Sequence, residues 1–397
     1  MTGPLRLAYL TPLPPARTGI ADYSVELLPH LAQLAEVVVY SEQFDHACPE
    51  LAALDARPLS EYSARRWEHD LPVYQIGNSR YHAGLAEMLL RYPGVMVLHD
   101  FGLHQLCVSR SLDAGRPVVY TREMGYALGP AGVAQSERVL AWEEAPPHFG
   151  VPLNDRFLAT SLGVLTHSRY AERLVLERAP SALSAVVPAP IRADEAPSLR
   201  ARLDLPADAC VFASFGLVSQ SKQLEAALVA FAEVRQEHPT AIYVVVGEWR
   251  PDDVDVVALV ARLGLEGTVR FTGFVPTRED FLGWLAAVDV VVNLRYPTVG
   301  ETSAVALRAL AAGRALVVYD HGWYAELPSD ACVKLPPLDE AALVRGMTTL
   351  ARDPELRAEL GARGQAYARA SHSPAAAARA YVAFAQVVLA RAGERFR

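Results

Sequence analysis

The stretch YPTVGETSAVALRALAAGRALVVYD, residues 296–320, contains the two patterns that decide the fold of this 397-residue chain. GETSAVALRALAAG, residues 300–313, has the apolar spacing of a helix bounded by a glycine at each end. ALVVYD, residues 315–320, is a β-branched run typical of a buried strand. A helix that leads directly into such a strand is half of a βαβ unit, so this stretch predicts a parallel sheet.

Strand-like runs followed by helical patterns recur along the chain. In the first half they are residues 5–11, 36–41, 72–77, 95–100 and 163–168, and in the second half 211–216, 241–247, 269–274, 289–294 and 315–320. Residues 181–209 between them hold four prolines and no apparent strand, which is typical of a linker. The pattern therefore predicts an α/β protein with two Rossmann-like parallel-sheet lobes.

The expected domains follow from these boundaries. They are a first lobe at 1–187, a linker at 188–208, a second lobe at 209–375 and a C-terminal helix at 376–397 that packs back on the first lobe. Ligands of open parallel sheets bind outside the carboxyl ends of the strands. The residues that directly follow each strand are therefore the candidates for a site.

Composition excludes several classes of function. The chain has 45 acidic and 37 basic residues, a formal charge of -8, which argues against a general nucleic-acid-binding surface. Its four cysteines, at positions 48, 107, 210 and 332, are widely scattered, and no histidines cluster with metal-ligand spacing. Asp253 and Asp255 form a DxD pattern, but they are expected to begin a helix. We expect no metal, no cofactor, no transmembrane segment and a cytoplasmic location, with peripheral contact to a membrane left open.

Two segments of the second lobe are candidates for phosphate binding. In FGLVSQSKQLEAAL, residues 215–228, Gly216 ends a strand and Lys222, one of only two lysines in the chain, stands at the head of a helix. Free N–H groups and the helix dipole favour an anion there. After Gly300, the N–H groups of Thr302 and Ser303 suit a pyrophosphate in the same way. The alternative is a solvated surface lysine and an ordinary helix start.

The spacing of Glu301 and Arg308 also carries information. Seven residues advance a helix by almost two turns, so a helix that begins at Glu301 would put both side chains on one face. The alternative is a favourable first-turn acid and an exposed arginine.

The first lobe offers weaker signals. Gly19 ends the proline-rich loop TPLPPARTG, residues 11–19, before a helix that carries Asp22. His99 and Asp100 follow one strand, and Asn78 follows another. An imidazole at a strand end can bind a sugar hydroxyl or act as acid or base, although a structural role is the alternative.

Together these motifs resemble the retaining GT-B glycosyltransferases of family 4, the glycosyl transferases group 1, which use nucleotide-diphosphate sugars. The resemblance extends over nearly the whole chain. Besides the lysine segment, it rests on VRFTGFVP at 269–276, LRALAAGRALVVYDHGWYAEL at 307–327, PPARTGIADYS at 14–24 and VLHD at 97–100.

The resemblance implies a role for each candidate residue. Lys222 would bind the diphosphate, His99 would contact the donor sugar and Glu301 would hold its hydroxyls. Other donor contacts would come from Gly19, Gly216, Phe274, Val275, Gly300, Thr302, Ser303 and Arg308, with Phe274 and Val275 beside the base. The acceptor would lie near Gly19, Asp22, Asn78 and Asp100.

Two departures from the family pattern affect these roles. The family carries two glutamates, and here the second falls on Arg308, while the first falls on Gly300 with Glu301 one position later. Arg308 cannot accept hydrogen bonds from ribose hydroxyls. Leu217 replaces the usual arginine before the lysine, and the hypothesis is that Arg295 supplies the missing cation.

The expected activity is therefore metal-independent transfer of a hexosyl unit, with retention, from a UDP- or GDP-sugar to a hydroxyl of a glycan, glycolipid or metabolite. The usage of arginine and alanine suggests a bacterium and polysaccharide biosynthesis. A nucleotide-sugar epimerase of similar fold and a catalytically silent nucleotide-sugar-binding partner remain as alternatives.

Overall fold

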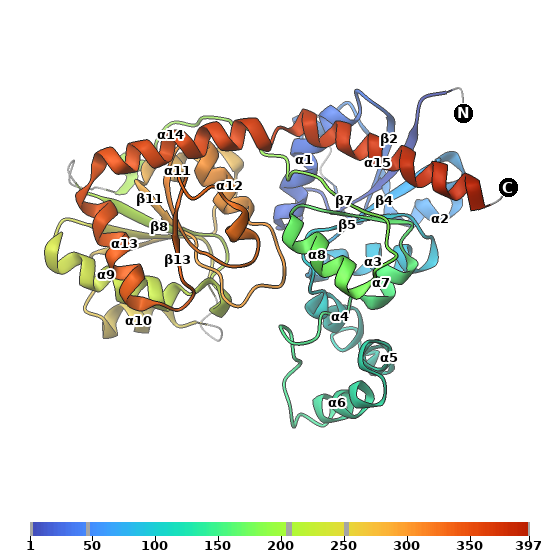
Figure 1. The fold of residues 1–397 in the computed structure, drawn as a ribbon, viewed down its shortest axis with the longest axis horizontal. Coiled ribbons are helices and arrows are strands. Elements are labelled where there is room, and N and C mark those ends of the chain that lie inside the picture. The colour runs from blue at the N-terminus through green and yellow to red at the C-terminus, as the bar shows by residue number, and fades with distance from the viewer. Residues whose placement is uncertain (1–2, 45–47, 204–208, 250–253, 396–397) are drawn as a thin grey trace. The chain divides into compact units, whose positions relative to one another are not determined.

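The structure is a computed structural model that describes residues 3–44, 48–203, 209–249 and 254–395. The chain forms two compact units (Figure 1). Unit 1 comprises Met1–Pro190, Val299–Thr302 and Ser373–Arg397, and unit 2 comprises Ile191–Thr298 and Ser303–His372. Of the predicted linker, residues 191–203 belong to unit 2 and residues 204–208 lie outside the described part of the chain.

Unit 1 contains a seven-stranded parallel sheet in the order β3-β2-β1-β4-β5-β6-β7. Its strands are β1 (Arg6–Leu10), β2 (Glu36–Ser41), β3 (Asp55–Pro58), β4 (Leu71–Ile76), β5 (Val95–Leu98), β6 (Gly163–Thr166) and β7 (Ser184–Val186). Successive residues of a strand point to opposite faces, and both faces are buried here, which explains the continuous apolar runs.

Helices cover both faces of this sheet. One face packs on α3 (Ala83–Arg91), α4 (His104–Ser111), α5 (Pro117–Leu128), α7 (Asp155–Thr160) and α8 (Arg169–Arg178). The short α2 (Tyr62–Arg65) follows β3. The helices α1 (Gly19–Leu31) and α15 (Pro374–Arg395) pack together, and the hydroxyls of Tyr23 and Tyr381 are 2.6 Å apart. The last helix therefore belongs to unit 1.

The helices α5 and α6 (Pro130–Leu140) form a hairpin at the edge of unit 1 (Figure 1). Two residues after α6, Trp142 has a left-handed backbone with φ of 62° and is 94% exposed. A bulky residue rarely adopts this conformation. Because the Trp142 side chain is exposed, burial does not offset the cost of this backbone.

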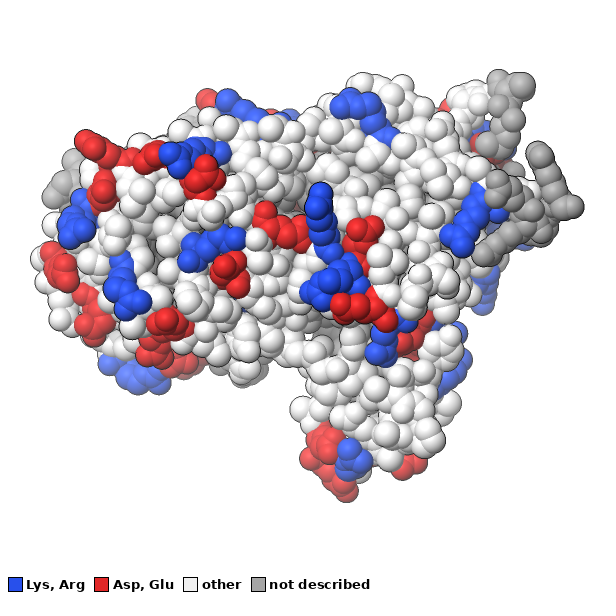
Figure 2. Space-filling model, viewed as in Figure 1, with Lys and Arg blue, Asp and Glu red and all other residues white. Residues whose placement is uncertain are grey.

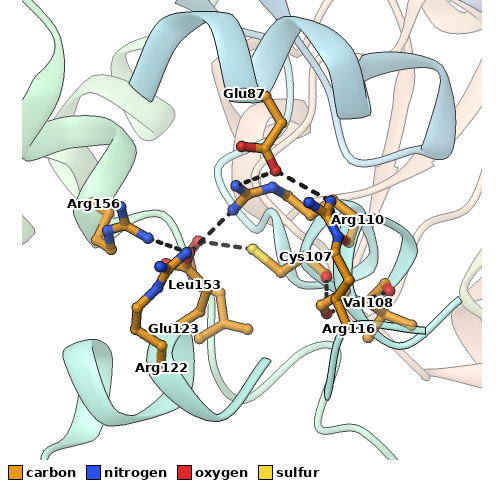
Figure 3. A network of polar contacts seen from close by, with 10 residues as sticks. Glu87, Cys107, Val108, Arg110, Arg116, Arg122, Glu123, Leu153 and Arg156 are labelled. Atoms are coloured by element: carbon orange, nitrogen blue, oxygen red, sulfur yellow. Dashed lines mark hydrogen bonds and ion pairs between the residues drawn. The ribbon is translucent and has the colours of Figure 1, made fainter. Parts of the chain in front are cut away.

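A buried ion-pair network joins this hairpin to the rest of unit 1 (Figure 3). Arg110 of α4 is 2% exposed and lies between Glu87 of α3, at 2.8 Å, and Glu123 of α5, at 3.1 Å. Glu123, 3% exposed, also pairs with Arg156 of α7 at 2.5 Å. Ion pairs thus connect four helices, with Arg110 and Glu123 buried at the centre and Glu87 and Arg156 partly exposed.

Unit 2 contains a six-stranded parallel sheet in the order β10-β9-β8-β11-β12-β13. Its strands are β8 (Val211–Phe215), β9 (Ile242–Val246), β10 (Val269–Gly273), β11 (Val290–Val292), β12 (Ala315–Tyr319) and β13 (Val333–Leu335). One face packs on α9 (Leu224–Glu237), α10 (Val256–Arg262) and α13 (Glu340–Arg352). The helices α11 (Arg278–Ala287), α12 (Ala304–Ala311) and α14 (Pro354–Ser371) lie on the other side (Figure 1).

The predicted fold class is confirmed, since both units are parallel sheets covered by helices. The sequence missed β3, β7 and β13, and the prediction that residues 181–209 contain no strand is wrong because β7 lies there. These three strands are short edge strands, and Pro58 ends β3 while Lys334 is central in β13. Edge strands commonly carry such residues, which interrupt the apolar run. The final helical pattern is two helices, separated at His372 and Ser373.

The mixed surface charge agrees with the sequence analysis, whereas one long apolar segment was not expected from it. On the face shown in Figure 2, basic and acidic side chains are interspersed among uncharged ones. The segment Pro354–Gly393, which spans α14 and α15, is long and apolar enough to cross a membrane, although core helices of soluble proteins pass the same test. All four cysteines are free thiols.

Candidate functional site

The lysine segment follows β8 in unit 2. Gly216 has φ of +86°, and a Cβ at this position would lie 2.7 Å from Lys222 Nζ. Lys222 ends the short 3-10 turn Gln220–Lys222, and its ammonium donates to the carbonyl of Phe215 at 2.9 Å. Helix α9 then begins at Leu224. The positive φ favours glycine here, and the absence of a side chain leaves space in which the ammonium lies against the end of the strand.

Arg295 lies in the loop that follows β11, the strand next to β8. Its Nη1 donates to Ser221 Oγ at 3.0 Å, and the backbone N–H of Tyr296 donates to the carbonyl of Ser221 at 2.8 Å. Gln223 Nε2 also donates to the carbonyl of Tyr296 at 2.8 Å. The structure therefore brings the arginine loop and the lysine loop together at the carboxyl edge of the sheet.

The helix that follows does not begin where the sequence predicted. Helix α12 starts at Ala304, and Ser303 is its N-cap, with its Oγ accepting from the N–H of Ala306 at 3.2 Å. Glu301 precedes the helix, so the prediction that Glu301 and Arg308 share a helical face is wrong. Glu, Thr and Ser in succession all suit a helix start, and the chain uses the last of them.

The segment Val299–Thr302, which carries Gly300, Glu301 and Thr302, belongs to unit 1. The carbonyl of Val299 accepts from the N–H of Gly102 at 2.7 Å. Gly300 has φ of +81°, and a Cβ there would lie 2.5 Å from the Cβ of Phe101. The carboxylate of Glu301 accepts from the N–H of Val299 at 2.8 Å, so a tight turn fixes its position.

Arg308 lies in α12 and is only 7% exposed. Its guanidinium carbon is 5.9 Å from the centre of the Phe281 ring, and Phe281 packs edge-on against Phe215 with ring centres 5.3 Å apart. The alternative that Arg308 is an ordinary exposed arginine is therefore wrong. Arg308 is a buried cation in the same unit as Lys222.

The end of β10 carries the residues expected beside a base. Gly273 has φ of +67° and forms an isolated bridge with Gly247. Phe274, 41% exposed, and the half-buried Val275 follow it. A Cβ on Gly247 would lie 2.4 Å from the carbonyl oxygen of Gly216, so the end of β9 lies close to the loop after β8.

His99 lies at the end of β5 in unit 1, in a cluster of rings that the sequence did not reveal. Its ring centre is 4.7 Å from that of Tyr23 and 4.8 Å from that of His167. Its Nε2 is 2.8 Å from Gln75 Oε1, an atom that can only accept, so Nε2 carries the proton and Nδ1 is an acceptor. Burial is the main cause that lowers the pKa of His99 well below its usual value, and the nearby His167 and His82 lower it further. The ring is therefore neutral at physiological pH.

Asn78 and Asp100 lie together at the carboxyl ends of the neighbouring strands β4 and β5. Asp100 Oδ2 accepts from the N–H of Asn78 at 2.7 Å, and Asn78 Oδ1 accepts from the N–H of Leu106 at 3.0 Å. These bonds brace the two loops. Gly19 begins α1 with open space beside its Cα, and Asp22 is exposed in the first turn of that helix.

Some features of the structure lie away from these residues. A groove of about 620 Å³ lies at the amino ends of β5, β6 and β7, where Pro93, Leu162 and Leu183 line it. Asp255 caps α10 as predicted, whereas Asp253 lies outside the described residues. Among the described residues, no three His, Cys, Asp or Glu side chains gather as a metal-binding group.

Comparison with known proteins assigns the domain in unit 2. Residues 209–353 match the family model of the glycosyl transferases group 1. Unit 2 carries a glycosyl transferases group 1 domain. The chain is therefore a transferase. No curated protein sequence matches it significantly.

Solved structures share the fold over nearly the whole chain. The sucrose-phosphate synthase of Thermosynechococcus elongatus has a TM-score of 0.69 at 18% identity, over 98% of this chain and 100% of that chain. HepE of Anabaena in complex with UDP-glucose has a TM-score of 0.67 at 17% identity, over 98% and 100%. WaaG, a glycosyltransferase involved in lipopolysaccharide biosynthesis, has a TM-score of 0.62 at 16% identity, over 96% and 99%. These identities are low, so the likeness concerns the GT-B fold.

Proposed function

We propose that this protein is a retaining glycosyltransferase that moves a hexosyl unit from a nucleotide-diphosphate sugar to a hydroxyl of a glycan, glycolipid or metabolite. The main support is the pair of bonded loops in unit 2, which carry Lys222 and Arg295 at one edge of the sheet. Breaking the anomeric bond leaves negative charge on the diphosphate, and fixed cations stabilise that charge.

A UDP-sugar is the proposed donor, with a GDP-sugar as the alternative. HepE has a similar fold and is known in complex with UDP-glucose, which supports a uridine nucleotide. Phe274 and Val275 would lie beside the base, and the N–H groups after Gly300 would reach the diphosphate. Arg308 would face the same negative charge, since it can donate but cannot accept hydrogen bonds.

Unit 1 supplies the groups for the sugar and the acceptor in this proposal. His99, neutral and with Nδ1 as an acceptor, would bind a hydroxyl of the donor sugar, and Glu301 would bind another. Gly19, Asp22, Asn78 and Asp100 would lie on the acceptor side. In the mechanism proposed for the resembling family, the acceptor hydroxyl attacks from the side that the nucleotide leaves, and a phosphate oxygen takes its proton. No metal and no protein nucleophile take part.

Thermal unfolding in the presence of nucleotides tests the donor site. UDP, GDP, ADP, TDP and CDP are added separately, and the cognate nucleotide should raise the Tm through mass action. The rise should disappear in Lys222→Ala and persist in Lys334→Ala. Lys334 is the matched control because its Nζ donates to the carbonyls of Ala325 and Leu327 in unit 2. A rise that persists in Lys222→Ala would contradict the proposed site.

Product analysis separates the proposal from its alternatives. A transferase gives a glycosylated acceptor or slowly hydrolyses the donor, and NMR should show that the first-formed sugar keeps the donor's anomeric configuration. An epimerase releases an altered nucleotide-sugar without any acceptor. A silent partner binds the nucleotide but turns over no donor. We propose that the transferase acts in polysaccharide biosynthesis in a bacterial cytoplasm.

A further inference from the structure

A tyrosine of the C-terminal helix joins two of the side chains that contact His99. The Tyr381 hydroxyl, in α15, lies 2.6 Å from the hydroxyl of Tyr23 in α1 and 3.5 Å from Nε2 of Gln75 in β4. The two helices run side by side in unit 1 (Figure 1). Tyr23, Gln75 and Tyr381 are all buried, so no bulk water replaces a bond that is lost among them.

Both partners of Tyr381 contact the His99 ring. Gln75 Oε1 lies 2.8 Å from His99 Nε2, and the Tyr23 ring meets the His99 ring edge-on, with ring centres 4.7 Å apart. The buried His167 packs against the same two rings, with its centre 4.8 Å from that of His99 and 5.0 Å from that of Tyr23. One hydrogen bond and two ring contacts therefore hold the His99 imidazole in place.

Tyr381 holds these partners whichever way its hydrogen bonds run. A tyrosine hydroxyl accepts as readily as it donates, so Tyr381 does not select which end of the Gln75 amide faces His99. Within the described part of the chain, Tyr381 is the hydrogen-bond partner of the Tyr23 hydroxyl and the second partner of the Gln75 amide. Loss of the Tyr381 hydroxyl would leave a buried hydroxyl unpaired and the amide held only by His99.

We infer that Tyr381 is a positioning residue for His99, through which the C-terminal helix contributes to binding of the donor sugar. This inference rests on the proposed function, in which His99 binds a hydroxyl of that sugar. A side chain that is immobile before the ligand arrives loses little freedom on binding, which increases the affinity. The sequence predicted that the last helix packs on the first lobe, but it singled out neither Gln75 nor Tyr381 as a site residue.

Calorimetric titration of the full chain with UDP and with UDP-glucose tests this role, and GDP with GDP-glucose is the corresponding pair for the alternative donor. Tyr381→Phe keeps the ring and removes the hydroxyl. It should weaken binding of the nucleotide-sugar by about 3- to 10-fold, the usual cost of one hydrogen bond. Binding of the free nucleotide should not change, because His99 contacts the sugar. Equal weakening of both ligands would mean that Tyr381 supports only the fold, and would overturn the inference.

Two variants of unit 1 are matched controls. Tyr9→Phe also removes a buried tyrosine hydroxyl, but this hydroxyl lies 3.4 Å from Ser24 Oγ. Phe384→Leu loosens the packing of α15, because the Phe384 ring lies 2.9 Å from where a Cβ on Gly163 would be. Both should lower the free energy of unfolding and keep the wild-type affinity for the nucleotide-sugar. If either variant weakens that affinity as much as Tyr381→Phe does, the inference fails.

A double-mutant cycle tests whether Tyr381 acts through His99. In the His99→Ala background, Tyr381→Phe should not weaken nucleotide-sugar binding further, whereas its effect on the free energy of unfolding should persist. The same loss of affinity in both backgrounds would contradict the positioning role.

The outcomes separate this inference from the function on which it rests. If the wild-type chain binds none of the four probes, the proposed donor site fails and the inference fails with it. If the wild-type chain binds UDP-glucose or GDP-glucose, and Tyr381→Phe binds it equally well, only the inference fails.

Discussion

The two units use similar sheets but present different polar groups at their carboxyl edges. In unit 2, Lys222 donates to the carbonyl of Phe215 and Arg295 donates to the hydroxyl of Ser221, and these bonds hold the two cations at the same edge. In unit 1, the corresponding edge carries the neutral His99 beside Gln75. The cations of one edge suit phosphate, whereas acceptors at the other, such as His99 Nδ1 and the carboxylate of Asp100, suit sugar hydroxyls.

Charged residues in the interior of unit 1 follow a third pattern, because Arg110 lies between two carboxylates. An arginine therefore has a structural role when carboxylates lie on both sides of it, as they do around Arg110. The following predictions test this distinction, and they run from the largest expected effect to the smallest.

Glu123→Ala should lower the free energy of unfolding by about 3–5 kcal/mol, because it leaves the charge of Arg110 buried without one of its partners. The matched control is Glu144→Ala, which breaks an exposed pair with Arg138 and should change the free energy of unfolding far less. Urea unfolding measures both. Similar values for the two variants would contradict a structural role for the network in Figure 3.

Lys222→Ala should lower kcat by roughly 10²- to 10³-fold, the usual cost of removing one group that stabilises transition-state charge. Its free energy of unfolding should change much less than that of Glu123→Ala. Steady-state kinetics with the cognate nucleotide-sugar measures the effect, and Lys334→Ala should retain near-wild-type kcat. Near-normal turnover in Lys222→Ala would contradict the distinction between a phosphate-binding edge in unit 2 and a hydroxyl-binding edge in unit 1.

Acid should destabilise the neutral histidines of unit 1. Burial lowers the pKa of His82 and of His104 to about 4. Both stay neutral in the folded chain while the unfolded chain binds protons below about pH 6.5, so stability falls as the pH drops from 6.5 toward 4. Each contributes a slope of about 1.4 kcal/mol per pH unit.

His104→Gln should therefore reduce that slope by about 1.4 kcal/mol per pH unit, whatever it does to stability at pH 7. Urea unfolding at several pH values between 4 and 7 measures the slope. An unchanged slope would mean that His104 takes up its proton without loss of the fold.

Two left-handed residues give the smallest effect and compare the units directly. Trp142 in unit 1 is 94% exposed, whereas Gln223 in unit 2 donates to the carbonyl of Tyr296. Glycine adopts this backbone without strain, so Trp142→Gly should raise the free energy of unfolding by about 1 kcal/mol. Gln223→Gly should gain less or lose stability, because it removes that hydrogen bond. A destabilised Trp142→Gly would reveal a packing role for the indole.

The sequence predicted the central strands and the lysine loop because their signals are local. Apolar runs and glycines mark β8, β9 and β12, and Lys222 stands out because the chain has only two lysines. The predicted helix start was wrong because glutamate suits a first turn and Thr302 and Ser303 are both good caps. The chain caps the helix with Ser303, whose Oγ also accepts from Asn293. Gln75, Ser221 and Asn293 were missed because their partners are far along the chain.

The position of α15 has a consequence for synthesis on the ribosome. Unit 1 begins at the amino terminus, yet Tyr381, Phe384 and Val388 of its last helix are buried, and a Cβ on Gly163 of β6 would lie 2.9 Å from Phe384 and from Val388. All of unit 2 is translated before these residues. The unit that starts first is therefore completed last, and until then one face of its sheet has α1 but lacks α15.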